Sequence, residues 1–136
     1  MERTQTMMTR EAAANLTVAD VMLSRPKTLA AAATVAEVRR LFENETLRTV
    51  LLVEGDSFVG TIERPDLPEA ATGSEPARAY ASTTAERITP GQLVAEVMPT
   101  IQASREGRVA VVGEDGTTLR GMLCLRKTYD AFCVDG

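Results

Sequence analysis

Two stretches of the chain carry nearly the same sequence, and this duplication restricts the possible folds more than any other feature. Val35-Ala-Glu-Val38 recurs 59 residues later as Val94-Ala-Glu-Val97. Further along, Gly60 has its counterpart 61 residues later in Gly121. Single-residue insertions in loops explain this small drift, and two copies are too few for a solenoid array. We therefore expect two small units of the same fold, related by a pseudo-twofold axis.

Each copy has a β-hairpin preceded by a helix. Residues 48–53 and 58–62 are β-branched and apolar runs joined by turn residues, which predicts a hairpin. The second copy has its turn at Asp115-Gly116. A capping box begins the helix expected over residues 34–44. With a brief strand before each helix and a helix after each hairpin, each copy is βαββα, which gives an α/β (α+β) fold class.

Three further helices are predicted from local signals. Asp66 can begin a short helix that Gly73 ends. Thr89-Pro-Gly-Gln92 has capping-box spacing and can begin another helix, which Pro99 should kink or end early. A final helix is expected from Arg126 to about Val134, because its apolar residues fall on one face.

The sequence also predicts the division of the chain. Residues 1–16 are polar and small, so we expect a mobile tail, with an arm that packs on a partner subunit as the alternative. A stretch rich in Ala, Ser, Thr, Gly and Pro, residues 71–84, marks the boundary between the copies. The first repeat is expected over 17–75 and the second over 76–136.

Composition excludes several classes of function. The net charge of −4 argues against nucleic acid or an anionic membrane as the main partner. No apolar run could span a membrane, and the N-terminal residues lack a secretory pattern, so a cytoplasmic protein is expected. The absence of histidine excludes His-dependent nucleophiles, His general bases and His-liganded zinc. Cys124 and Cys133 are expected to be buried reduced thiols, with a disulfide as the alternative.

In its order of motifs, the chain resembles a tandem pair of CBS domains, the arrangement called a Bateman module. The likeness covers nearly everything from Thr17 to Cys133. It is carried by the stretches Thr17-Val-Ala-Asp-Val-Met22, Ala33-Thr-Val-Ala-Glu-Val38, Leu51-Leu-Val-Glu-Gly-Asp-Ser-Phe-Val-Gly60 with Asp66, Val109-Ala-Val-Val-Gly-Glu-Asp-Gly116 and Leu119-Arg-Gly121.

The resemblance implies a stand-alone, non-catalytic regulatory module. Members of this family bind ligands that contain adenosine in clefts between the two repeats, and two modules commonly form a homodimer. The implied partners are an adenosine-type ligand, such as a nucleotide, and a separately encoded effector protein, with no metal and no other cofactor. The candidate ligand-binding residues are Thr28, Leu29, Val50, Glu63, Arg64, Asp66, Arg126 and Lys127.

This chain departs from the family's ligand motif in both copies. In the family, a glycine is followed by a Thr or Ser near the phosphates and then by an Asp that binds the ribose hydroxyls. Asp66 fits the ribose role, but Glu63 stands at the hydroxyl position. A phosphate about 4 Å from that carboxylate would be repelled by roughly 4 kcal/mol at an effective dielectric constant near 20. In the second copy, Cys124 replaces the hydroxyl residue and Lys127 replaces the Asp.

Three interpretations of function follow. The first is a ligand sensor, in which Asp66 binds ribose; the alternative role of Asp66 is only to cap a helix. The second is an assembly module, a homodimer whose degenerate nucleotide sites bind nothing. The third is an enzyme, which the missing histidine and the lack of a phosphate-binding glycine loop argue against.

Overall fold

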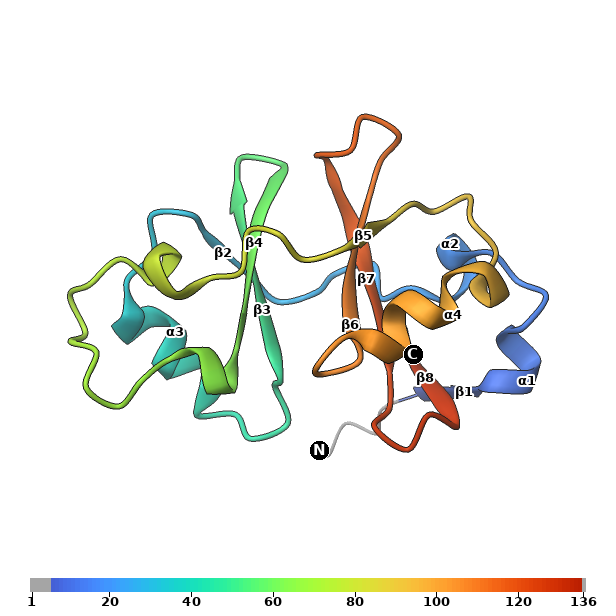
Figure 1. Cartoon of the computed structure of the whole chain (residues 1–136), viewed down its shortest axis with the longest axis horizontal. Helices are drawn as coiled ribbons and strands as arrows, with labels where there is room; N and C mark the ends of the chain where they lie inside the picture. The colour runs from blue at the N-terminus through green and yellow to red at the C-terminus, as the bar shows by residue number, and fades with distance from the viewer. Residues whose placement is uncertain (1–5, 136) are drawn as a thin grey trace. The chain divides into compact units, whose positions relative to one another are not determined.

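The computed structural model describes residues 6–135, which form two compact units (Figure 1). The middle unit is built from residues 26–85. The terminal unit combines the described segments on either side, residues 6–25 and 86–135. Each unit has its own sheet and its own hydrophobic core.

The middle unit contains a three-stranded sheet in the order β2-β3-β4. Strand β2 runs parallel to β3, and β3 pairs with β4 as an antiparallel hairpin. Helix α3 follows β2 along the chain, and two short 3-10 helices follow β4. The elements are β2 (Thr28–Ala30), α3 (Val35–Phe42), β3 (Thr49–Glu54), β4 (Ser57–Glu63), η1 (Arg64–Asp66) and η2 (Ala77–Tyr80).

Helix α3 begins at the predicted capping box and covers one face of this sheet. The backbone N–H of Glu37 donates to Thr34 Oγ1, and the Glu37 carboxylate accepts from the Thr34 N–H, both at 3.3 Å. One side of the helix packs against the strands in a buried cluster of Val38, Phe42, Val50, Leu52, Ile62 and Ala77. The apolar stripe predicted for this helix therefore faces the core.

The terminal unit contains a five-stranded sheet in the order β1-β8-β7-β6-β5. Parallel pairing joins β5 to β6, and the other neighbours are antiparallel. The elements are β1 (Thr6–Thr9), α1 (Arg10–Ala13), α2 (Val18–Val21), β5 (Arg87–Ile88), α4 (Val94–Ala103), β6 (Arg108–Val112), β7 (Leu119–Leu125) and β8 (Ala131–Val134).

One face of the five-stranded sheet packs against helices α1, α2 and α4. Alternate residues of the strands point to this face, as the two-residue period of a strand requires. The buried cluster includes Val109 and Val111 of β6, Leu123 and Leu125 of β7, and Phe132 of β8. From the helices it includes Ala13, Val18, Val21, Val94, Val97 and Ile101.

The predicted α/β class and the duplicated strand-helix-hairpin order are confirmed. The middle unit has β2-α3-β3-β4 and the terminal unit has β5-α4-β6-β7. The two hairpins also share a register shift, between Leu52 and Val53 in one and between Val111 and Val112 in the other. In the described residues, no helix has the length and apolar character needed to cross a bilayer.

The predicted final helix from Arg126 to Val134 is wrong. Residues 126–130 form a turn, closed by the Arg126 N–H donating to the Ala131 carbonyl at 2.9 Å. The apolar residues that follow form β8, which pairs with β7 on one side and β1 on the other. Strand pairing on both sides overrides the helical pattern.

The helix predicted from Asp66 to Gly73 is also wrong. The chain makes only one 3-10 turn, η1, in which Asp66 is the last residue. Residues 67–75 then follow an irregular path held by Arg39, whose guanidinium donates to the carbonyl oxygens of Pro68 and Ala71 at 3.1 and 2.7 Å. Neither copy therefore has the second helix of the predicted βαββα pattern.

Helix α4 differs from its prediction at both ends. Thr89 to Gln92 forms a turn, with the Thr89 N–H donating to Gln92 Oε1 at 2.9 Å, and the helix begins only at Val94. It continues through Pro99 to Ala103, so the expectation of an early end is wrong. Proline removes one intrahelical hydrogen bond there, and burial of the apolar face of α4 offsets that loss.

The expected mobile tail, residues 1–16, is wrong for the part that the structure describes. Thr6–Thr9 form β1, paired residue for residue with β8. The Thr9 hydroxyl caps α1 by accepting from the Ala12 N–H at 3.2 Å, and Ala13 is fully buried. Residues 1–5 lie outside the described residues.

The compact units are offset from the two predicted repeats, 17–75 and 76–136. Residues 17–25 pack in the terminal unit, and residues 76–85 pack in the middle unit. Backbone pairing holds residues 76–85 against the middle unit, since Thr61 and Ser82 exchange hydrogen bonds of 3.0 and 2.8 Å. The repeat boundaries themselves stay a prediction from the sequence.

Candidate ligand site

The eight candidate residues are divided between the two units. Six belong to the middle unit: Thr28 and Leu29 on β2, Val50 on β3, Glu63 at the end of β4, and Arg64 and Asp66 on η1. The other two, Arg126 and Lys127, lie in the turn after β7 of the terminal unit. Each group is therefore described within its own unit.

The end of β4 turns sharply into η1, and two carboxylates hold this turn. The Glu63 N–H donates to Asp66 Oδ2 at 2.7 Å, as part of a capping box across η1. Asp66 is half-buried, so it supports the turn that precedes it and does not begin a helix after it. A carboxylate has about four acceptor positions, so one carboxylate can serve a backbone N–H and hydroxyl donors together.

The sheet face turned away from α3 carries buried polar side chains at this end. Thr49 lies opposite Glu63 in the β3–β4 register, and Thr61 lies two residues earlier on β4. The exposed fractions of these residues are 2% for Thr49, 8% for Glu63 and 9% for Thr61. Among the described residues, Thr49 Oγ1 is a buried oxygen with no hydrogen-bond partner. Buried polar groups normally have partners, so this patch is a candidate for binding a polar ligand.

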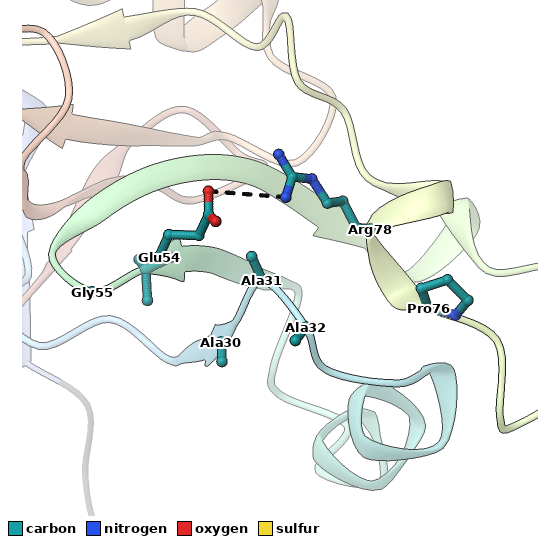
Figure 2. Close-up of a pocket in the computed structure, with 8 residues that line it drawn as sticks. Ala30, Ala31, Ala32, Glu54, Gly55, Pro76 and Arg78 are labelled. Carbon is teal, nitrogen blue, oxygen red and sulfur yellow. Dashed lines mark ion pairs between the residues drawn. The ribbon is translucent and has the colours of Figure 1, made fainter.

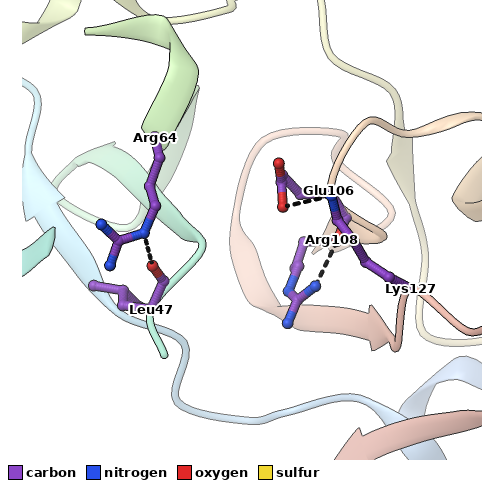
Figure 3. A network of polar contacts seen from close by, with 5 residues as sticks. All are labelled: Leu47, Arg64, Glu106, Arg108 and Lys127. Atoms are coloured by element: carbon purple, nitrogen blue, oxygen red, sulfur yellow. Dashed lines mark hydrogen bonds and ion pairs between the residues drawn. The ribbon is translucent and has the colours of Figure 1, made fainter. Parts of the chain in front are cut away.

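Arg64 is held by the segment that follows α3. Its Nε donates to the Leu47 carbonyl at 2.8 Å (Figure 3), and a second donor reaches the Asn44 carbonyl. The guanidinium also lies 4.9 Å from the centre of the Phe42 ring, as a cation–π contact. These contacts give Arg64 a structural role in the middle unit.

The β-strand candidates differ in their exposure. Thr28 and Leu29 are half-buried on β2, opposite Leu51 and Leu52 of β3. Val50 is completely buried in the core beneath α3. Its side chain therefore supports the sheet on the α3 side, which is the face opposite the polar patch.

In the terminal unit, Lys127 forms an ion pair with a buried carboxylate. Its Nζ lies 3.6 Å from Glu106 Oε1, and Glu106 is only 7% exposed (Figure 3). Arg108 donates to the backbone carbonyl of the same glutamate. Arg126 is exposed in the turn. At the position where the family has its ribose-binding Asp, this copy therefore has an internal ion pair.

Sequence reasoning missed Thr49 and Glu106. In the sequence, Thr49 is one of several β-branched residues of a strand, and only its pairing with Glu63 places it in a polar patch. Glu106 stands in a polar stretch, Ser104 to Gly107, that is typical of an exposed loop. Neither residue carried a local signal of burial.

The middle unit also has an open hollow at the opposite end of its hairpin. Its volume is about 500 Å³, and alanines, Val53 and Pro76 line most of it (Figure 2). Glu54 and Arg78 form a 3.9 Å ion pair at its rim, and both side chains are more than half exposed. None of the predicted ligand residues lines this hollow.

Residues 18–72 match the sequence model of the CBS domain family. The matched segment contains the first six candidate residues and the polar patch around Glu63. No curated protein sequence matches the chain.

Several solved structures are similar in fold to this chain. The chain is similar to the CBS-pair protein CBSX2 from Arabidopsis thaliana, with a TM-score of 0.72 and 15% identity, covering 81% of this chain and 89% of that one. It is also similar to the cystathionine beta-synthase pair domain of a Shewanella oneidensis MR-1 protein, with a TM-score of 0.66 and 23% identity, covering 76% and 61%.

A third similar structure is the cytosolic domain of the Mg2+ channel MgtE in complex with ATP, with a TM-score of 0.64 and 20% identity. The match covers 75% of this chain and 43% of that one. The chain thus spans less than two thirds of the Shewanella and MgtE structures. At these identities the similarity shows the fold, which is that of the CBS-pair proteins.

Proposed function

Because the chain contains a CBS domain at residues 18–72 and has the fold of the CBS-pair proteins, we propose that it is a non-catalytic regulatory module that binds an adenosine-type ligand. The ligand binds the middle unit where β4 meets η1. Asp66 accepts hydrogen bonds from the ribose hydroxyls, since one carboxylate can accept two hydroxyl donors at once.

The observation that carries this proposal is the buried polar patch next to Asp66. Thr49, Thr61 and Glu63 are all at most 9% exposed, and the Thr49 hydroxyl has no partner among the described residues. A ligand hydroxyl or amine placed there would satisfy that oxygen. The fold gives secondary support, because the similar MgtE domain was solved in complex with ATP.

The proposed ligand carries no phosphate beside Glu63. Glu63 is only 8% exposed and stands at the position where the family has a hydroxyl, and a phosphate close to an ionised carboxylate would be repelled. Adenosine and S-adenosylmethionine therefore fit this position better than AMP or ATP. A nucleotide binds here only with its phosphates directed away from Glu63.

The test is a thermal-shift and calorimetric titration of the full chain with adenosine, AMP, ATP, NAD and S-adenosylmethionine. Asp66→Asn retains an oxygen for the Glu63 N–H but loses the charge, so the fold is kept. Asp56→Asn, on the exposed hairpin turn at the other end of β3 and β4, is the matched control.

At least one compound is expected to stabilise the natural chain and Asp56→Asn, and to stabilise Asp66→Asn less. Absence of stabilisation by all five compounds would contradict the proposal. If Asp66→Asn binds the ligand as tightly as the natural chain does, the ligand does not depend on the Asp66 carboxylate.

A second candidate is a homodimeric assembly module that binds an effector protein and no nucleotide. It is favoured by the structural roles of three expected ligand residues: Arg64 donates to the carbonyl of Leu47, Val50 is in the core, and Lys127 is paired with Glu106. Native mass spectrometry of freshly purified protein separates the two candidates. A dimer without a co-purified small molecule supports assembly alone, and a monomer at micromolar concentration contradicts it.

A further inference from the structure

The two cysteines of the chain face each other across neighbouring strands. Cys124 of β7 and Cys133 of β8 are direct partners in the antiparallel register. Both are 2% exposed. Their strand neighbours Leu125 and Phe132 point into the helix-covered core. By the alternation of a strand, both thiols therefore lie on the other face of the sheet.

The direct opposition of the two cysteines in the register is compatible with the Cα separation that a disulfide spans. Directly opposed residues of an antiparallel pair have Cα atoms about 4.5–5.5 Å apart. Disulfides join residues whose Cα atoms are about 4.4–6.8 Å apart. Both thiols lie on the same face of the sheet, side by side on neighbouring strands.

We propose that Cys124 and Cys133 form a reversible dithiol–disulfide pair, oxidised by a peroxide and restored by a low-molecular-weight thiol. This proposal is independent of the proposed ligand site, because it concerns a cysteine pair of the terminal unit.

The two sulfurs have different parts in this reaction. The hydrogen bond from the Cys124 thiol lowers the pKa of Cys133 to about 7, and the nearby cations of Arg108 and Arg126 also favour its thiolate. The same hydrogen bond, together with burial, raises the pKa of Cys124. Cys133 is therefore the nucleophile, because the thiolate is the reactive form of cysteine.

The reaction balances with hydrogen peroxide as the oxidant. The Cys133 thiolate attacks one peroxide oxygen, the O–O bond breaks, and the hydroxide that leaves takes a proton to become water. The sulfur of Cys124 then attacks the sulfenic acid of Cys133, the S–S bond forms and the S–O bond breaks. The second hydroxide takes the Cys124 proton and leaves as a second water.

Both thiols are buried, so the oxidant reaches them only when β7 and β8 separate locally. The register between these two strands contains only two residue pairs, Cys124 with Cys133 and Leu125 with Phe132. On its other side, β8 is paired with β1 along all four of its residues. Local separation of β7 from β8, with β8 still held by β1, is therefore the opening that exposes the pair.

The test treats the reduced full-length protein with increasing hydrogen peroxide and then measures intact mass and free thiols under denaturing conditions. The natural chain is expected to lose two hydrogen atoms in mass and both titratable thiols. Peptide mapping without reductant should find Cys124 linked to Cys133 in the monomeric species, and dithiothreitol should restore both thiols.

Two variants test the assigned roles. Cys124→Ser should stop at a sulfenic acid on Cys133 that a dimedone-type reagent labels, and Cys133→Ser should react several-fold more slowly. Because either serine could disturb the sheet, circular dichroism and thermal melting of both variants accompany the assay.

Three results would overturn the proposal. The first is that the folded natural chain keeps both thiols at peroxide concentrations that oxidise the urea-unfolded chain. The second is a disulfide between two copies of the chain in place of one within a copy. The third is that dimedone labels Cys124 in preference to Cys133.

Discussion

The ammonium of Lys127 lies 3.6 Å from Glu106 Oε1, an oxygen that is buried and has no hydrogen bond among the described residues. This ion pair joins the loop before β6 to the turn after β7. A buried carboxylate that loses its counter-ion costs several kcal/mol in a dry site. The Lys127 side chain is 61% exposed, so solvent screening reduces the effect here.

We therefore expect Lys127→Met to lower the free energy of unfolding by about 1–2 kcal/mol. Urea denaturation measures this change. The double variant Lys127→Met with Glu106→Gln should recover most of the loss, because no unpaired charge is then left buried. If the two substitutions are simply additive, the carboxylate and the ammonium do not interact.

The buried carboxylate of Glu63 should select against phosphorylated ligands. Glu63→Gln keeps the shape of the side chain and removes its charge. If a nucleotide binds beside η1, this variant should bind ATP or AMP at least about tenfold more tightly, a gain of about 1.4 kcal/mol. The affinity for adenosine should change little. Calorimetric titration measures both, and equal gains for adenosine and ATP would show that the effect is not electrostatic.

Gly107 is fixed by the close approach of β7. Its φ is +73°, and a Cβ built there would be 2.3 Å from the Leu125 carbonyl oxygen. Gly116 has a similar φ, +77°, with nothing within 4 Å of a built Cβ. Gly116→Ala should therefore cost only the left-handed strain, about 1–2 kcal/mol. Gly107→Ala should cost about 3 kcal/mol or more, because the hairpin must also open. Urea midpoints that are the same for both variants would contradict this account.

Asp115 makes the hairpin turn of the terminal unit sensitive to acid. The Thr118 hydroxyl and the N–H groups of Thr117 and Thr118 donate to its carboxylate, which lowers the pKa of Asp115 to about 2. A depressed pKa adds stability above the ordinary value of 3.8, and that stability is lost as the pH falls towards 2.

The natural chain should consequently lose more stability than Asp115→Asn over this pH range. Urea midpoints measured for both proteins at intervals across the range test the prediction. Parallel curves for the two proteins would mean that the turn carboxylate does not contribute to the acid sensitivity.

Arg39 holds the irregular segment that replaces a predicted helix. Its Nη2 donates to the carbonyl of Ala71 at 2.7 Å and to that of Pro68 at 3.1 Å. Arg39→Met should loosen residues 68–71 and make them the first site of proteolytic cleavage, because the carbonyls of Pro68 and Ala71 lose the guanidinium that holds them. Gly73 and Glu75 should stay in place, since their carbonyls accept from the N–H groups of Ala36 and Val35. Arg40→Met, an exposed neighbour on the same helix, is the control. Equal cleavage patterns for the two variants would contradict the structural role of Arg39.

The strand-helix-hairpin order that occurs in both copies could be predicted from the sequence, because the signals for a helix start and a hairpin turn are local. Thr34 and Glu37 form the expected capping box, and the hairpin turn at Asp115-Gly116 lies where its residues predict. The predicted final helix failed because Ala131–Val134 pair on both sides with strands, one of them at the other end of the described chain. No local pattern indicates such pairing.

The candidate site could be predicted only in part for the same reason. Motif spacing identified Glu63 and Asp66, which the structure brings together in one capping box. Spacing alone did not indicate that Arg64 would be held by the carbonyls of Leu47 and Asn44, or that Thr49 would be buried opposite Glu63. These contacts depend on how β3, β4 and α3 pack.

The pairing of β1 with β8 has a consequence for how the protein is made. When a ribosome has released residues 26–85, the middle unit already has all of its strands and can close. The terminal unit has to wait, because β1 is synthesised before the middle unit and its hydrogen-bonding partner β8 is synthesised after it. A nascent chain stalled before Ala131 would thus contain a folded middle unit and an incomplete terminal unit, a state that pulse proteolysis of arrested chains can detect.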